Sequence, residues 1–244
     1  NGHKYTTYVY NNDATCLKDG TKTAICDYSC GKGTHTVTAT GTKKAHSYTR
    51  TYVASKATLS ADGIIRKACA CGAYINSGKI SKIKTVKLSY TSKSYTGKSL
   101  KPTVTVKDAA GKPIASTNYT VTYSKNKSVG KATAKVVFKG NYSGTKTLTF
   151  KIVPKKTSIS SLKAGKKSLT VKFKKQTSGS GYEIQYSTSK SFKGAKTVKI
   201  SKNKTVSKTI KKLKSKKTYY VRVRVTKGGS YKSSWSSVKK VKVK

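Results

Sequence analysis

Five cysteines and three histidines are the residues of this chain best suited to chemistry, and all of them lie in its first third. They are His3, Cys16, Cys26, Cys30, His35, His46, Cys69 and Cys71. Structural Zn²⁺ sites take four Cys or His ligands in a tetrahedron. A set of Cys16, Cys26 and Cys30, completed by His46 or alternatively by His3, therefore predicts a zinc ion. Its role would be structural, because no glutamate lies nearby to act on a metal-bound water.

Two other interpretations of the cysteines stay open. A disulfide could join Cys16 to Cys26 or to Cys30, and one of the five cysteines would then remain an odd thiol. Alternatively, the cysteines are free, partly buried thiols of a decayed repeat. The odd number of cysteines and the spacing from Cys26 to Cys30 favour the metal.

The cysteines belong to a duplicated segment, because the opening run His3-Lys-Tyr-Thr-Thr returns as His46-Ser-Tyr-Thr-Arg. At the same offset Asp19-Gly20 matches Asp62-Gly63 and Cys26 matches Cys69, and after a two-residue deletion Cys30 matches Cys71. Cys16 falls on Leu59, so the second copy has only three ligands of its own. We predict copies at about 3–45 and 46–80. Each is expected to be a small β-hairpin that turns at Asp-Gly and needs a staple.

Period-two alternation fills the rest of the chain and predicts two further small β modules, at 81–153 and 155–244. Runs such as Tyr119-Thr-Val-Thr-Tyr123 and Tyr219-Tyr-Val-Arg-Val-Arg-Val225 carry it. Alternation places one set of side chains in a core and the other in water. Tyr219 begins its strand, where its hydroxyl can bond to upstream backbone as a tyrosine corner.

Three stretches resemble known families. Residues 155–244 resemble a fibronectin type III domain, through Gly181-Tyr-Glu-Ile-Gln-Tyr186 and the strand that starts at Tyr219. Residues 81–153, with Gly140-Asn-Tyr-Ser-Gly-Thr145, resemble a bacterial immunoglobulin-like surface module. Residues 1–80 resemble short His/Cys repeats of secreted Gram-positive gut-anaerobe proteins, through their Ala-Thr-Cys…Gly…Cys…Cys-Gly pattern. The resemblances imply an all-β fold, with a duplicated hairpin segment followed by an Ig-like and a fibronectin type III β-sandwich.

The charge is strongly basic, with 54 Lys and Arg against 6 Asp and Glu and a formal net charge of +48. Only Arg50, Arg66, Arg222 and Arg224 are arginines. Lysine is a strongly hydrated point charge, whereas specific nucleic-acid recognition favours the arginine fork. The excess therefore predicts attraction to anionic cell-wall polymers or glycans, without specific nucleic-acid binding.

The chain carries no constellation typical of an enzyme. Its six acids are scattered, so no carboxylate pair flanks a glycosidic bond, and all histidines lie in the duplicated segment. No run is apolar enough for a transmembrane segment. The absence of Met indicates that residues precede Asn1, and any signal peptide would lie there.

These features predict a non-catalytic spacer of an extracellular protein, secreted or cell-wall-associated, monomeric and built as beads on a string. The alternative is a carbohydrate-binding or adhesion module. Its candidate ligand-binding residues are Tyr95 and Tyr142 in turns, Trp235 near the end of the chain, and the adjacent arginines Arg222 and Arg224.

Overall fold

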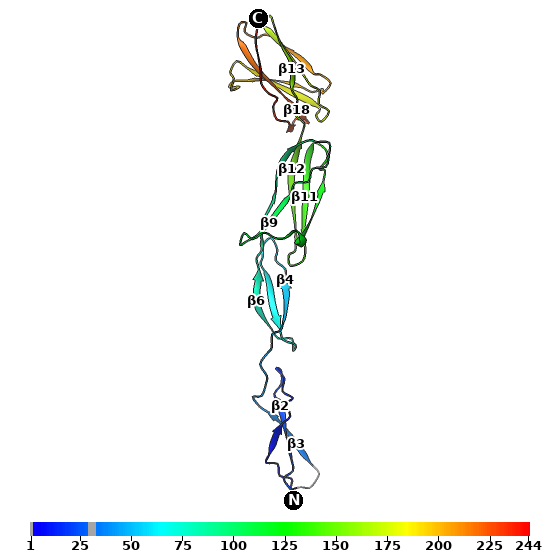
Figure 1. The fold of residues 1–244 in the computed structure, drawn as a ribbon, viewed down its shortest axis with the longest axis vertical. Helices are drawn as coiled ribbons and strands as arrows, with labels where there is room; N and C mark the ends of the chain where they lie inside the picture. The colour runs from blue at the N-terminus through cyan, green and yellow to red at the C-terminus, as the bar shows by residue number, and fades with distance from the viewer. Residues whose placement is uncertain (1, 29–32) are drawn as a thin grey trace. The chain divides into compact units, whose positions relative to one another are not determined.

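The computed structural model describes residues 2–28 and 33–244, and strands dominate it (Figure 1). One short 3₁₀ turn, η1 (Ser116–Asn118), is the helical element among these residues. The predicted all-β fold is confirmed. The described part of the chain contains no helix with the length and apolar character needed to cross a membrane. Two compact units divide the chain: residues 1–83 together with Gly140–Ser143, and the remaining residues from Lys84 to the end.

The first unit contains two three-stranded antiparallel sheets, each with its strands in sequence order. Their strands are β1 (Tyr8–Tyr10), β2 (Gly20–Ile25) and β3 (Thr34–Ala39), then β4 (Arg50–Ser55), β5 (Gly63–Ala68) and β6 (Tyr74–Ile80). The predicted Asp-Gly hairpin turn is wrong, because Gly20 and Gly63 begin the central strands instead. A Cβ at Gly63 would meet the carbonyl oxygen of Ser55 at 2.6 Å, so glycine serves close backbone approach there.

The equivalent aspartate accepts a similar backbone hydrogen bond in each of the two copies. The backbone N–H of Lys43 donates to Asp19 Oδ1 over 3.0 Å, and that of Lys82 donates to Asp62 Oδ1 over 2.7 Å. The buried apolar residues of the described part of the first unit are small except for one isoleucine: Ala24, Cys26, Ala39, Ala57, Ala68, Cys69 and Ile83. So little apolar material supplies only a weak core, and such units need an additional staple.

The second unit begins with a four-stranded sheet and a separate strand pair. The sheet has the order β10 (Tyr119–Ser124), β11 (Gly130–Phe138), β12 (Thr145–Val153), β8 (Ser92–Ser94), and the pair is β7 (Ile83–Leu88) with β9 (Val104–Asp108). Inward-facing residues alternate along β9 and β11, and Phe150 and Ile152 of β12 are fully buried. Tyr123 packs against this core, and its hydroxyl donates to the carbonyl oxygen of Pro102 over 2.6 Å.

Residues 159–242 form two sheets around a large core cluster. One sheet has the order β13 (Ile159–Gly165), β14 (Ser168–Phe173), β17 (Ser207–Ile210). The other contains β16 (Lys196–Ile200), β15 (Gly181–Ser187), β18 (Thr218–Lys227) and β19 (Tyr231–Lys232), with β20 (Lys239–Lys242) also paired to β18. The predicted tyrosine corner is confirmed, because the Lys214 N–H donates to the Tyr219 hydroxyl over 3.1 Å.

Candidate metal centre

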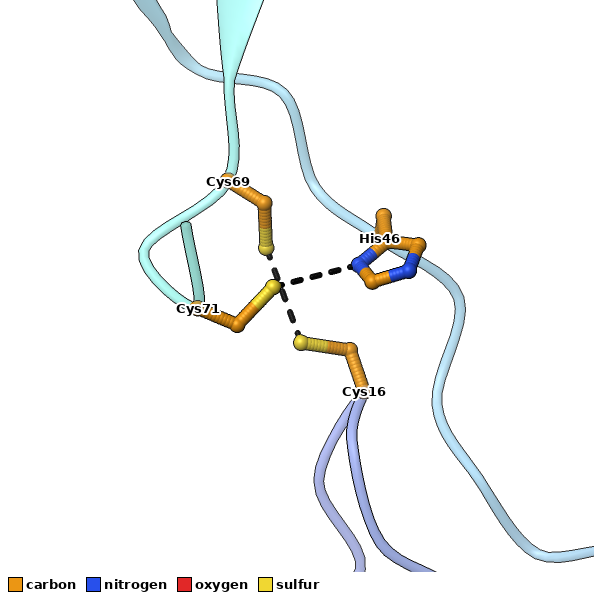
Figure 2. A group of neighbouring side chains, drawn as sticks. All are labelled: Cys16, His46, Cys69 and Cys71. Atoms are coloured by element: carbon orange, nitrogen blue, oxygen red, sulfur yellow. Dashed lines mark hydrogen bonds between the residues drawn. The ribbon is translucent and has the colours of Figure 1, made fainter. Parts of the chain in front are cut away.

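Four side chains of the first unit converge in one cluster: Cys16, His46, Cys69 and Cys71 (Figure 2). Their ligand atoms all lie within 4.8 Å of one another. The Sγ atoms of Cys16 and Cys69 are 3.6 Å apart, and Cys71 Sγ lies 3.2 Å from His46 Nδ1. Cys69 is buried, Cys16 and Cys71 are half-buried and His46 is exposed. The cluster is therefore partly exposed, and an ion could reach it from solvent.

Tight turns present three of the four ligands. The Thr15 hydroxyl accepts hydrogen bonds from the N–H groups of Leu17 and Lys18, which fixes the turn that carries Cys16. Cys69 and Cys71 follow β5 in a second turn, where the Gly72 N–H donates to the Cys69 carbonyl oxygen over 3.0 Å. Gly72 has φ +94°, a backbone conformation that favours glycine. Both sulfur-bearing turns are thus held by the chain's own hydrogen bonds.

Two of the ligand distances are close to those expected around a tetrahedral zinc ion. Zn–S bonds of about 2.3 Å and a Zn–N bond of about 2.0 Å imply S···S edges of roughly 3.8 Å and S···N edges of roughly 3.6 Å. The observed 3.6 Å between Cys16 and Cys69 and 3.2 Å between Cys71 and His46 are close to these values. Three thiolates and one imidazole also suit Zn²⁺ by ligand type. Four protein ligands fill the tetrahedron, as in structural rather than catalytic sites.

Hydrogen bonds prepare one of the thiols for a metal. The backbone N–H of Cys71, the His46 side chain and the Cys71 side chain lower the pKa of Cys69 to about 6, and the backbone of Ser47 contributes. Cys16 has the opposite environment: its hydrogen bond with the Cys71 side chain, burial and the nearby Cys69 raise its pKa to about 12. Cys69 therefore offers a thiolate at neutral pH, and Cys16 must lose a proton to become a ligand.

The cluster draws its members from both copies, whereas the predicted site drew its cysteines from the first copy. Cys16 and His46 are brought together as predicted. Cys26 lies elsewhere, with its Sγ 3.3 Å from His3 Nδ1, and Cys30 lies outside the described residues. The place of Cys26 is taken by Cys69, which with Cys71 had been assigned to an incomplete set of three. The sequence does contain a signal for this arrangement. The second copy lacks one of four ligands, because Leu59 stands at the cysteine position, and Cys16 of the first copy can supply the missing one.

The cysteine pairing also bears on the disulfide interpretation. Cys16 lies beside Cys69 and not beside Cys26, so the proposed Cys16–Cys26 pair is not formed. Cys16, Cys69 and Cys71 form no disulfide bond. The 3.6 Å between the Sγ atoms of Cys16 and Cys69 is far beyond the roughly 2.05 Å of a disulfide bond.

The predicted ligand-binding arginines form a ladder with aromatic rings on the outer face of β18. Arg222 lies 4.0 Å from the Phe192 ring centroid and 4.7 Å from that of Trp235, and Arg224 lies 4.2 Å from Trp235. Arg224 also pairs with Glu183 at 2.6 Å. The Glu183 side chain is only 7% exposed, although it lies on the outer face of the sheet with the arginines. The side chains of Trp235 and the two arginines therefore stack on one another within the protein.

Two serines beside Trp235 attach its segment to β18. The Ser233 hydroxyl accepts from the Val225 N–H over 2.9 Å, and the Ser236 hydroxyl accepts from the Val223 N–H over 3.0 Å. The serine hydroxyls thereby accept the backbone hydrogen bonds of β18 that a neighbouring strand would otherwise accept with its carbonyl oxygens. Trp235 is positioned as a cover over the arginines.

The two predicted sugar-stacking tyrosines are half-buried. Tyr95 packs against the core formed by Ala132, Phe150 and Ile152. Tyr142 forms a bridge with Ala57, and the flanking Ser143 N–H donates to the Ala57 carbonyl oxygen over 2.9 Å. The Tyr95 ring therefore contacts protein on at least one side, and the backbone around Tyr142 is held by its pairing with Ala57.

Comparisons with known proteins bear on the end of the chain. A family profile described as the Rha78A-like, N-terminal immunoglobulin domain matches residues 168–243. No curated protein matches the chain. The solved structure of chicken CNTN1 FN1-FN3 domains is 16% identical, with a TM-score of 0.35, over 75% of this chain and 78% of that one. A beta-1,2-glucanase from Parabacteroides distasonis is 17% identical, with a TM-score of 0.29, over 46% of this chain and 17% of the glucanase. Residues 168–243 are thus similar to an immunoglobulin-like β-sandwich domain.

Proposed function

We propose that this chain is a non-catalytic spacer of a secreted or cell-wall-associated bacterial protein, and that a structural zinc ion fastens its two N-terminal repeats together. The observation that carries the proposal is the convergence of Cys16 of the first copy with His46, Cys69 and Cys71 of the second, all ligand atoms within 4.8 Å. An ion held there would cross-link two sheets whose buried residues are mostly alanine and cysteine. Zinc would thus replace a hydrophobic core as the source of stability.

The absence of catalysis is inferred from how the carboxylates are used. Each of the six acids accepts a hydrogen bond from the chain itself, and five of them bond to a backbone N–H: Asp13, Asp19, Asp27, Asp62 and Asp108. The sixth, Glu183, pairs with Arg224 and Lys232. Acids that hold turns and strands together are poorly placed to activate water or a sugar. Immunoglobulin-like domains also serve widely as non-catalytic modules.

Metal analysis tests the zinc centre. The full chain, purified under reducing conditions without added zinc, should contain close to one equivalent of zinc that resists mild chelation. Cys71→Ser should remove that equivalent, whereas Ser47→Ala, beside His46 but contributing only its backbone, should keep it. A mass two units below that of the reduced protein, with no bound metal, would establish the disulfide interpretation and contradict the proposal.

We further propose that lysines retain the spacer at anionic wall polymers or glycans. The supporting observation is the charge balance, because 54 Lys and Arg against 6 Asp and Glu leave a formal net charge of +48. Among the described residues, ion pairs involve only Lys79, Arg224 and Lys232 on the basic side. Nearly all lysines therefore face solvent without an acidic partner. A diffuse cationic surface of this kind attracts polyanions of many types.

Salt separates this proposal from the carbohydrate-binding alternative. Binding of the full chain to polyphosphate and to a panel of neutral glycans should be measured at low and at moderate ionic strength. Charge-driven retention on polyphosphate should fall steeply as salt screens the lysines. Retention of a neutral glycan at high salt would instead support stacking on Tyr95, Tyr142 or Trp235 and would contradict the electrostatic proposal.

A further inference from the structure

The metal cluster has a direction along the chain, because one copy gives a single cysteine and the next gives the other three ligands. The single cysteine is Cys16, which lies in the turn at Thr15. We call this turn the giving turn, and we call the His and Cys ligands that it meets in the next copy the receiving side. The second copy has the same turn at Thr58, whose hydroxyl accepts from the N–H groups of Ser60 and Ala61 over 3.1 and 2.9 Å. There, however, Leu59 stands in the cysteine position. The second copy therefore receives a thiol and gives none.

The first copy contains the receiving arrangement as well. His3 Nδ1 lies 3.3 Å from Cys26 Sγ. In the second copy His46 Nδ1 lies 3.2 Å from Cys71 Sγ, and the His46 side chain also hydrogen-bonds to Cys69, the counterpart of Cys26. The His3 ring also lies 6.1 Å from that of Tyr5, tilted by 35°, and His46 lies 5.7 Å from Tyr48, tilted by 37°.

The receiving cysteines are alike too. Cys26 and Cys69 are both buried, at 6% and 8% exposure. The backbone N–H of each closes a turn: Cys26 donates to the Gly33 carbonyl oxygen over 3.3 Å, and Cys69 donates to that of Ala73 over 2.8 Å. By sequence register Cys30 is the counterpart of Cys71, and it lies outside the described residues. The geometry around His3 and Cys26 is thus that of the receiving side.

We propose that His3 and Cys26 belong to a second centre for a zinc-like divalent cation, and that its giving thiolate comes from the Ala-Thr-Cys turn of a further repeat of the same kind. This inference rests on the proposed zinc function of the first centre. Repeats would then be joined head to tail, each passing one cysteine to the copy that follows it. Cys16 does not serve as this thiol, since it lies with His46, Cys69 and Cys71.

The second copy is built as the end of such a series. With Leu59 it has no cysteine to pass on. The turn at Thr58, which corresponds to the giving turn, is hydrogen-bonded to other parts of the chain. The Ala57 N–H donates to the Asn141 carbonyl oxygen over 3.0 Å, and the Ile83 N–H donates to the Thr58 carbonyl oxygen over 2.8 Å. A terminal repeat that differs from the others at its outer face is the expected design of a repeat array.

The test adds one repeat. A second copy of residues 3–45 is placed directly before His3 of the full chain, and Co²⁺ is titrated as a spectroscopic substitute for zinc. The native chain should bind one equivalent tightly, and the extended chain should bind two with similar spectra. The matched control is the extended chain with Cys16→Leu in the added repeat only, which copies the natural Leu59. Its second equivalent should bind more than about 100-fold more weakly, since loss of outer partners alone costs about 10- to 100-fold.

His3→Ala in the original first copy of the extended chain gives an independent readout. It should remove the second equivalent and keep the first, which also verifies that the extended chain is folded. Equal affinity of the second equivalent with and without the added cysteine would overturn the inference while the first centre stands. Failure of the native chain to bind any tight equivalent would contradict the proposed zinc function and this inference together.

Discussion

Cys16 Sγ lies 3.6 Å from Cys69 Sγ although 53 residues separate the two cysteines in the chain. Each comes from a different copy of the repeat, at a turn fixed by local hydrogen bonds. A metal at this point closes a long loop, and long closed loops restrict the unfolded chain strongly. The stability of the first unit should therefore depend on this one contact more than on any apolar residue.

Removing Cys16 should abolish tight zinc binding. Cys16→Ser leaves three ligands, so we expect the zinc dissociation constant to rise more than about 100-fold, measured by competition with a chromophoric chelator. Leu59→Ser, at the equivalent turn of the second copy, is the matched control and should bind zinc like the native chain. Equal zinc affinity of the two variants would show that Cys16 is not a ligand.

Chelation should loosen the first unit and spare the last strands. Structural zinc contributes about 10–16 kcal/mol in small zinc-dependent folds, which is more than the free energy of unfolding of a small domain. After zinc removal, amides in β1 to β6 should therefore exchange hydrogen much faster, as measured by mass spectrometry. Amides in β14, β15 and β18, which surround the large core, should keep their protection. Uniform exchange rates before and after chelation would argue against a structural metal.

Acid should weaken the last strands through Glu183. Burial acts to raise the pKa of Glu183, but hydrogen bonds and charges from Arg224 and Lys232 outweigh it and lower the pKa below its usual value. A carboxyl group whose pKa is lower when folded contributes stability above its unfolded pKa of about 4.3. That contribution is lost as pH falls through the lower folded-state pKa.

Glu183→Gln should accordingly reduce the free energy of unfolding by about 3 kcal/mol at pH 7, because it breaks a largely buried ion pair. The difference from the native chain should shrink below pH 4, when the native carboxylate is also protonated. Urea unfolding followed by Trp235 fluorescence at several pH values measures both. Asp13→Asn, in the first unit, is the control and should leave this transition unchanged.

Trp235 should act on stability rather than on sugar binding. Its ring contacts both Arg222 and Arg224, so Trp235→Ala should cost about 2 kcal/mol through lost cation–π contacts and packing. Trp235→Phe should recover part of that loss, which circular dichroism melts would detect. Loss of neutral-glycan retention in Trp235→Ala at unchanged melting temperature would point instead to a ligand platform.

Much of the fold followed from short-range patterns. Alternation located the strands around Tyr119 and Tyr219. Successive side chains of a strand point to opposite faces, so burial of one face produces an apolar residue at every second position. The Asp-Gly turns were misread for a reason that sequence does not display. Gly63 is needed because backbone from Ser55 to Ala57 approaches it closely, and only the folded chain reveals that contact.

The members of the Cys/His cluster were half predictable. Residue types and the duplication identified Cys16 and His46 as candidates, but spacing along the chain favoured grouping Cys16 with its neighbour Cys26. The actual partners lie in the other copy, and their choice depends on how the two copies face one another. Likewise, Arg222 and Trp235 looked available for a ligand, since no short-range pattern indicates that their side chains stack together.

The small number of acidic groups has a consequence for how this surface can be controlled. With only six acids and three histidines in the sequence, lowering the pH towards 5 can add little to a formal charge of +48. Mild acidification should therefore leave the proposed charge-driven binding to polyanions nearly constant. Ionic strength and competing polyanions remain as the means by which such a chain could be released from its surface.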